Sequence, residues 1–427
     1  MQSVSETPVD PGPPPTPIRL VVTDDLHRSR LTVGFRLLLA LPHLLWALLW
    51  TAAIAPIAFV VWLAVLFERR APRQLHGFLA AYVRYTTHLS AYLAIAANPY
   101  PGFTGEPGYP VDVEIDPPVR QGRWGAAFRL LLAVPALLLA TALGGSLSGQ
   151  LSGGVAVVSG GAGLVSVAGL LGWFAALARG RMPHGLRDAA VYGIGYSAHA
   201  AGYALLLTDR YPSADPSLVA PAAELPPHPV RIDVRDGFGR SRILVAFRLL
   251  LSIPHFVWLT LWSVPALLAA FLAWLVALVT GRVPRHLHRF LAAYVRYGAH
   301  VVAFLWLVGG PFPGFVGAAG SYPVEPVLPE PRRQRRLSVA FRGLLAIPAL
   351  IVSGAYSSAL FVLGFLGFWA ALATGRIPSG LRNLGVAAIR YSAQAHAYLL
   401  LLTDRYPYSA PALHDRPHPS TDDEETG

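Results

Sequence analysis

The chain has 427 residues, of which 54% are hydrophobic and only 13% are charged, and its mean hydropathy is +0.47. A typical soluble domain carries about 25% charged residues, so the composition excludes an ordinary soluble enzyme and a disordered chain. The absence of Cys also excludes a disulfide-rich secreted domain. The formal net charge is +11 and every basic residue is Arg, a usage typical of a bacterial genome rich in GC.

Internal repeats organise the whole sequence. The segment Phe35–Leu39 (FRLLL) returns at Phe128–Leu132, at Phe247–Leu251 and, with one change, at Phe341–Leu345. A Pro follows the Arg of each copy by six residues. The copies are alike in alternate pairs: Phe78–Tyr85 is identical to Phe290–Tyr297, and Leu205–Pro212 is identical to Leu400–Pro407. The order is therefore A-B-A′-B′, in which one half of the chain repeats the other.

This order divides the chain into four units and two tails. We place a tail at 1–16, unit A at 17–108, unit B at 109–215, unit A′ at 216–320, unit B′ at 321–410 and an acidic tail at 411–427. Both tails are polar or rich in Pro, so we expect them to be disordered. Met1–Pro17 has no basic region followed by an apolar one, and it is not a signal peptide.

Each unit is predicted to open with a short strand. The pattern is clearest at Tyr109–Asp116, where apolar residues alternate with acidic ones, so that Asp112 is expected on the exposed face. His228–Val234 repeats the alternation, and Ile18–Val22 shows it weakly. In unit B′ we expect Pro326 to break the strand.

A basic cluster and then a long uncharged run follow each strand. The runs are Leu37–Phe67, Leu130–Ala178, Leu249–Gly281 and Gly343–Gly375. A membrane-spanning helix needs about 20 apolar residues, so each run is too long for one straight span. The second run contains Gly144–Gly163, rich in Gly and Ser, which predicts a loop between two helices. By repetition we expect a helical hairpin in every unit, and Ser353–Ser358 would form the tip in unit B′.

The charges predict how these hairpins lie in the membrane. Arg flanks both ends of every uncharged run, so both ends of each hairpin are expected to be cytoplasmic, as are both chain termini. A third segment in each unit ends near a Pro-containing turn. In unit B′ its uncharged part, Tyr391–Thr403, is too short to cross easily, which favours an amphipathic or re-entrant helix on the cytoplasmic side. Two crossings per unit of a bacterial plasma membrane follow, and three per unit remain the alternative.

The third segment places polar residues on one helical face, since Tyr85, His88 and Tyr92 follow i, i+3, i+7 spacing. The equivalent residues are Tyr196, His199 and Tyr203, then Tyr297 and His300 (with Phe304), and finally Tyr391, Gln394 and Tyr398. They could form a His-lined site, or they could sit at the depth of the lipid headgroups. We favour headgroup depth, because no carboxylate lies nearby in sequence to orient an imidazole.

Each uncharged run begins beside a repeated Arg. These residues are Arg36, Arg129, Arg248 and Arg342. A guanidinium at this position can reach lipid phosphate, or it can bind carbonyls and aromatic faces inside the bundle. The constant register favours a specific phosphate or backbone contact over simple charge anchoring. His43 and His255 follow the repeated Pro, and we interpret them as structural.

These motifs give the chain a family resemblance. The YPV-type strand at Tyr109–Val111, the FRLLLxxPH motif at Phe247–His255, the TGRxP turn at Thr374–Pro378 and the end of the third segment at Leu402–Pro407 resemble the domain of unknown function 4389 family. The resemblance covers nearly all of residues 17–410 in repeated copies. It implies a bacterial integral membrane protein, and it carries over no activity and no site residues.

Taken together, the sequence predicts an all-α integral membrane protein with short cytoplasmic β-strands and amphipathic helices. Walker, HExxH and GxSxG motifs are absent, so we expect no enzyme and no cofactor or metal. The leading function is a structural or interaction scaffold whose basic cytoplasmic face meets anionic lipid headgroups or a protein partner. The Arg residues are not gathered on one tail, which argues against nucleic acid. The alternative is a transporter or channel for an apolar or lipid-like solute. A polar cavity between the halves would favour transport, and a packed core would favour the scaffold.

Overall fold

The computed structural model describes residues 16–145, 163–220, 223–224 and 228–414, and most of these residues are helical. In each unit a long apolar stretch precedes an inner helix of 21 residues. The long helices are α1 (Arg30–Glu68), α4 (Arg129–Gly144) with α6 (Leu164–Arg179), α10 (Arg248–Thr280) and α13 (Arg342–Thr374). The inner helices are α2 (Arg73–Leu93), α7 (His184–Ala204), α11 (Arg285–Leu305) and α14 (Ser379–Leu399). Short helices are α3 (Arg123–Ala127), α8 (Pro216–Val219), α9 (Arg242–Ala246) and α12 (Arg336–Ala340).

The prediction of a hairpin in each uncharged run is wrong. α1, α10 and α13 are continuous helices of 39, 33 and 33 residues. The expected tip in α13 stays helical, because the hydroxyls of Ser357 and Ser358 donate to the carbonyls of Ser353 and Gly354 four residues earlier, at 2.9 and 3.4 Å. Ser side chains bonded in this way satisfy themselves within the helix and need no turn. By length and composition, α1, α10 and α13 could each cross a membrane.

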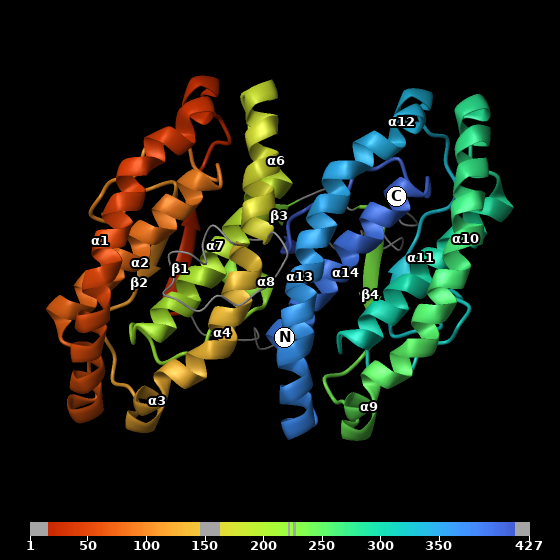
Figure 1. Cartoon of the computed structure of the whole chain (residues 1–427). Coiled ribbons are helices and arrows are strands. Elements are labelled where there is room, and N and C mark those ends of the chain that lie inside the picture. The colour runs from red at the N-terminus through yellow and green to blue at the C-terminus, as the bar shows by residue number, and fades with distance from the viewer. Residues whose placement is uncertain (1–15, 146–162, 221–222, 225–227, 415–427) are drawn as a thin grey trace, which may run out of the picture.

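Unit B contains the same long helix with a break in its middle. α4 and α6 follow one another end to end (Figure 1). The hydroxyl of Ser166 donates to the carbonyl of Gly144 at 2.7 Å. A Cβ on Gly163 would lie 2.1 Å from the backbone nitrogen of Gly145, so only glycine fits this junction. Most of the predicted Gly/Ser-rich loop, residues 146–162, lies outside the described residues, as do 1–15 and 415–427 of the two predicted tails.

The described elements form three layers. The long helices stand side by side in the order α1, α4 with α6, α13 and α10 (Figure 1). The inner helices pack behind them: α2 on α1, α7 on α4 and α6, α14 on α13, and α11 on α10. Within the inner layer α2 contacts α7 and α11 contacts α14. Small sheets pack on the other side of the inner helices, where β2 contacts α2 and β5 contacts α11.

The strands pair between units. β1 (Ile18–Val22) runs antiparallel to β2 (Val111–Ile115), and β4 (Arg231–Val234) runs antiparallel to β5 (Val324–Val327). Two corrections follow. Pro326 does not break β5 and lies opposite Ile232, because both strands of a two-stranded sheet are edge strands, which tolerate Pro. The second tail begins later than expected, since β6 (Leu413–His414) is ordered and pairs in parallel with β3 (Ala223–Glu224).

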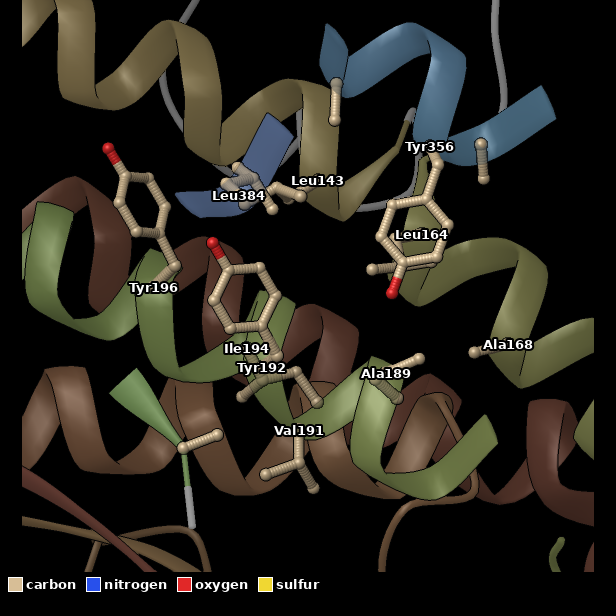
Figure 2. Packing of buried hydrophobic residues seen from close by; sticks show 14 of the residues in the cluster. Leu143, Leu164, Ala168, Ala189, Val191, Tyr192, Ile194, Tyr196, Tyr356 and Leu384 are labelled. Carbon is tan, nitrogen blue, oxygen red and sulfur yellow. The ribbon is translucent and has the colours of Figure 1, made fainter. Parts of the chain in front are cut away.

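The two halves share one apolar core. Small and branched side chains of α4 and α6 meet those of α13 and α14 in a single buried cluster (Figure 2). Its central members are Ala136, Leu139, Leu143, Leu164, Ala349, Val352, Tyr356, Leu360 and Leu384. Ala at many contact positions lets the helix backbones approach closely, a packing that is also found in bundles of membrane helices.

Candidate functional site

The turn after each inner helix carries a strained residue. Ile95, Leu206, Leu307 and Leu401 have φ between 59° and 64°, a left-handed conformation that bulky residues rarely adopt. The helix C-terminus is also the negative end of the helix dipole, with unpaired carbonyls. This turn therefore needs donors from elsewhere in the chain.

One side chain from the basic cluster before each long helix (residues 27–30, 120–123, 240–242 and 332–336) supplies a donor. Arg28 Nε donates to the Ile95 carbonyl at 2.9 Å, and Arg240 Nε donates to that of Leu307 at 3.0 Å. In units B and B′ a Gln takes this role: the side-chain amides of Gln121 and Gln334 donate to Leu206 and Leu401 at 2.6 Å. These four residues were not predicted as binding residues, because each one contacts a turn that lies more than 60 residues away in the sequence.

The repeated Arg of each long helix binds the same turn. Each is almost fully buried, with 2 to 3% of its surface exposed. Arg36 Nη1 donates to the carbonyls of Tyr92 and Ala97 at 2.6 and 3.0 Å, and its guanidinium lies 4.3 Å from the centre of the Tyr92 ring. Arg248 contacts Phe304 in the same way, with its guanidinium 4.4 Å from the ring.

In units B and B′ the Arg and the Gln also bind one another. Arg129 donates to the side-chain oxygen of Gln121 at 2.7 Å and stacks 4.2 Å from the Tyr203 ring. Arg342 donates to the side-chain oxygen of Gln334 at 2.8 Å and stacks 4.0 Å from the Tyr398 ring. Arg342 also forms a 2.9 Å ion pair with Asp404.

We call this repeated arrangement the arginine clamp: the Arg of the long helix, the Arg or Gln of the basic cluster, and the turn they hold. Of the two roles predicted for the repeated Arg, these contacts favour binding to carbonyls and aromatic faces. The guanidinium groups are enclosed by protein, which argues against contact with lipid phosphate. The guanidinium is flat and carries several N–H donors in one plane, so it can bind the carbonyls of the turn and stack on an aromatic ring at the same time.

The polar face of the inner helices points into the interior of the protein. Tyr92, Tyr203 and Tyr398 lie under the clamp Arg residues, as above. The hydroxyls of Tyr85 and Tyr297 lie 3.1 and 2.7 Å from the imidazoles of His43 and His255 on the long helices. All of these side chains are buried, because the long helices cover this face on one side and the sheets cover the other.

In units B and B′ this face also contacts the core between the halves and the segments that cover it. In unit B′ the amide of Gln394 donates to the Val230 carbonyl at 3.0 Å and accepts from the Tyr408 backbone at 3.2 Å. The Tyr391 ring centre lies 5.4 Å from that of Tyr356 in the core between the halves. Tyr196 is buried in the same core (Figure 2).

Two histidines of this face meet carboxylates that the sequence did not lead us to expect. His88 Nε2 lies 2.7 Å from Asp112 Oδ1, and His300 Nε2 lies 2.9 Å from Glu325 Oε2. Each carboxylate belongs to the strand of the following unit, and Arg84 or Arg296 approaches it at 3.7 or 3.5 Å. The expectation that Asp112 is exposed is wrong: burial disfavours its charge, but hydrogen bonds from His88 and from the backbone of Gly108 and Val113 hold its pKa below the usual value.

His199 stands beside a cavity of about 220 Å³ in unit B. The cavity is lined by residues that include Ile18, His199, Thr208, Tyr211 and Leu218. Burial lowers the pKa of His199 to about 4, against the opposing effect of a backbone hydrogen bond with Ile18. The imidazole is therefore neutral at pH 7. Within the described residues no group of three or more His, Asp or Glu side chains is arranged to hold a metal ion.

A family profile described as a domain of unknown function (DUF4389) matches residues 30–104, 242–313 and 336–410. Each match begins at the start of a long helix or the short helix before it, and runs through the inner helix and the turn after it. It includes the repeated Arg of the clamp, whereas the cluster residue (Arg28, Arg240 or Gln334) lies two residues before the match. Together the three segments account for more than half of the chain. No curated protein and no solved structure matches this chain.

Proposed function

This chain belongs to the domain of unknown function 4389 family, and we propose that it is a membrane scaffold that presents basic surfaces to anionic lipid headgroups or to a protein partner. The observation that carries the proposal is the packed apolar core between the halves. A transport pathway between pseudo-symmetric halves needs a polar or hollow interface. Here Leu139 and Leu143 of one half meet Val352 and Leu360 of the other in one buried cluster.

The surface of the long helices supports membrane residence. Large apolar side chains point outward along their whole length, including Leu37 at 72% exposure and Leu267 at 66%. Exposed apolar area of this extent on a monomer marks a membrane or protein interface. Exposed Arg residues stand at the helix ends, including Arg333 and Arg336 beside α12. Such residues attract anionic lipid by roughly 1 kcal/mol each.

Lipid binding by the purified protein tests the proposal. We expect preference for vesicles containing phosphatidylglycerol over neutral vesicles, and we expect it to fall when Arg332, Arg333, Arg335 and Arg336 are replaced by Gln. The matched control replaces Arg231 and Arg235, which are exposed on the strand layer, and should leave the preference unchanged. An unaltered preference in the first variant would contradict the proposed role of these basic residues.

A second measurement separates the scaffold from the transporter. Proteoliposomes carrying a fluorescent lipid in both leaflets are treated with dithionite, which bleaches only the outer leaflet. A scaffold should give the same protected fraction as empty liposomes. Loss of that protection, in vesicles that remain sealed, would instead support movement of a lipid-like solute.

A further inference from the structure

We infer that the long helices lie within one leaflet of the bilayer, parallel to its plane, and do not cross it. The occupant of their outer face is then the acyl-chain region of a single leaflet, and anionic headgroups contact the Arg residues at the helix ends. This inference rests on the proposed membrane residence and adds the orientation. Four independent features of the described residues support it.

The first feature is that the exposed apolar side chains are concentrated on the layer of long helices. Large exposed apolar side chains cover α1, α4, α6, α10 and α13. None of the exposed large apolar residues belongs to the inner helices α2, α7, α11 and α14, which are described in full. A protein that crosses the bilayer exposes an apolar belt around its circumference, because lipid surrounds it. A protein seated in one leaflet needs only one apolar face.

The second feature is the position of the strand layer. Arg19 of β1 forms exposed ion pairs with Glu114 and Asp116 at 3.3 and 3.2 Å. In Figure 1, β1 and β4 stand at the height of the middle of the long helices, and not above or below the ends of those helices. If the helices crossed the bilayer, these exposed charges and strand edges would sit at the depth of the hydrocarbon core. Lipid-exposed sheet edges do not occur there, and exposed charges are costly.

The third feature combines charge with helix continuity. Exposed Arg residues stand at both ends of the long helices: Arg242 and Arg282 flank α10, and Arg336 and Arg376 flank α13. Arg concentrates on one side of a membrane. A hairpin would bring both ends to that side, but α10 and α13 are continuous. A continuous helix keeps both ends on one side only when it does not cross.

The fourth feature is length. At a rise of about 1.5 Å per residue, the 33 residues of α10 extend for roughly 50 Å. The hydrocarbon core is about 30 Å thick and the average tilt of a spanning helix is about 20°. A crossing α10 would place exposed apolar side chains at one or both of its ends, such as Leu249 or Val279, outside the core. A helix in the plane of the leaflet keeps all of them at one depth.

Depth measurements along α10 test the orientation. The chain has no native Cys, so single Cys residues can replace Leu250, Leu261 and Leu272, which are exposed by 61, 60 and 52%. Each is labelled with a fluorophore in reconstituted vesicles that contain lipid with a nitroxide at a shallow or a deep acyl position. We expect the same ratio of shallow to deep quenching at all three sites. A ratio that shifts several-fold toward deep quenching at Leu261 alone would overturn the inference.

A control variant and three further outcomes distinguish the orientation of the helices from membrane residence itself. Arg235→Cys on the strand layer should escape both quenchers and should react with an impermeant thiol reagent. A crossing profile would defeat the orientation and leave membrane residence intact. Loss of the protein from membranes at alkaline pH, with no quenching at any site, would defeat both. Cross-linking between copies through the α10 residues, without lipid quenching, would show a second copy on this face and would overturn the inference.

Discussion

His88 on the inner helix of unit A is bound by Asp112, which the strand of unit B brings to 2.7 Å from its imidazole nitrogen. This contact between His88 and Asp112 therefore connects unit A to unit B within the first half of the chain. His300 and Glu325 form the equivalent contact in the second half, at 2.9 Å, with a longer acidic side chain. Recurrence of the contact with a different carboxylate indicates that the position requires an acid and not one particular residue.

Replacement of Asp112 by Asn should lower the melting temperature of the detergent-solubilised protein at pH 7. A hydrogen bond with a charged partner contributes about 1.5–3 kcal/mol, and the buried imidazole would keep a weaker partner. The pKa of Asp112 is lowered in the folded state, so its contribution is present above pH 4 and is lost as the pH falls through the folded value. The Asn variant should lack that acid-dependent loss. Glu114→Gln, on the exposed face of the same strand, should change neither quantity.

Lys in place of Arg248 should destabilise the protein although it keeps the charge. The guanidinium donates to the carbonyls of Phe304, Gly309 and Gly310 and lies over a ring, whereas an ammonium is a compact point charge. We expect a loss on the order of 2 kcal/mol, read as a lower melting temperature in detergent. Arg282→Lys, at the exposed end of the same helix, is the control. Equal melting temperatures for the two variants would show that only the positive charge of Arg248 matters, and not the geometry of its guanidinium.

The stability of the protein should depend on His199 between pH 6.5 and 4. The pKa of the folded imidazole is about 4, and that of an unfolded one is about 6.5. Within this window the unfolded chain binds the proton and the folded chain does not, so stability falls as the pH falls, by at most about 1.4 kcal/mol per pH unit. His199→Gln introduces the side chain found at Gln394 in unit B′ and should flatten this part of the profile. His396→Gln, at an exposed position, should leave it unchanged.

Removal of residues 146–162 should leave the fold and its stability intact. Unit B′ makes the same long helix without a break, and in unit B the flanking residues Gly145 and Gly163 already meet. The shortened chain should show the helical circular dichroism and the melting temperature of the parent. A large fall in melting temperature would mean that the removed segment contributes contacts to the folded protein.

Repetition and alternation were the parts of this structure that a single sequence could predict. Identical segments such as Phe78–Tyr85 and Phe290–Tyr297 lie in equivalent helices, and the alternating segment at Val111–Ile115 is a strand. These features are local, because the periodicity of a segment is written in its own residues. The inner helices were also expected, although as interfacial helices and not as a buried layer.

The remaining features depended on neighbours that are distant in sequence. The alternating pattern predicts that Asp112 is an exposed strand residue. Its contact with His88 arises only because β2 pairs with β1 and packs against α2. The serines of α13 resemble a turn until their hydroxyls are seen to bond within the helix. The clamp Arg residues were compatible with lipid or with carbonyls, and the strained turn at Leu307 that favours carbonyls has no signature in the sequence.

The junction at Gly145 and Gly163 has a practical consequence. The chain leaves the long helix at one glycine and returns at another that touches it, so the two ends of any inserted module would need to be adjacent. Many small folded domains meet that requirement, since their termini often lie close together at the surface. A fluorescent reporter or an epitope could therefore be carried at this point without separating α4 from α6. The other three long helices are continuous and offer no comparable insertion point.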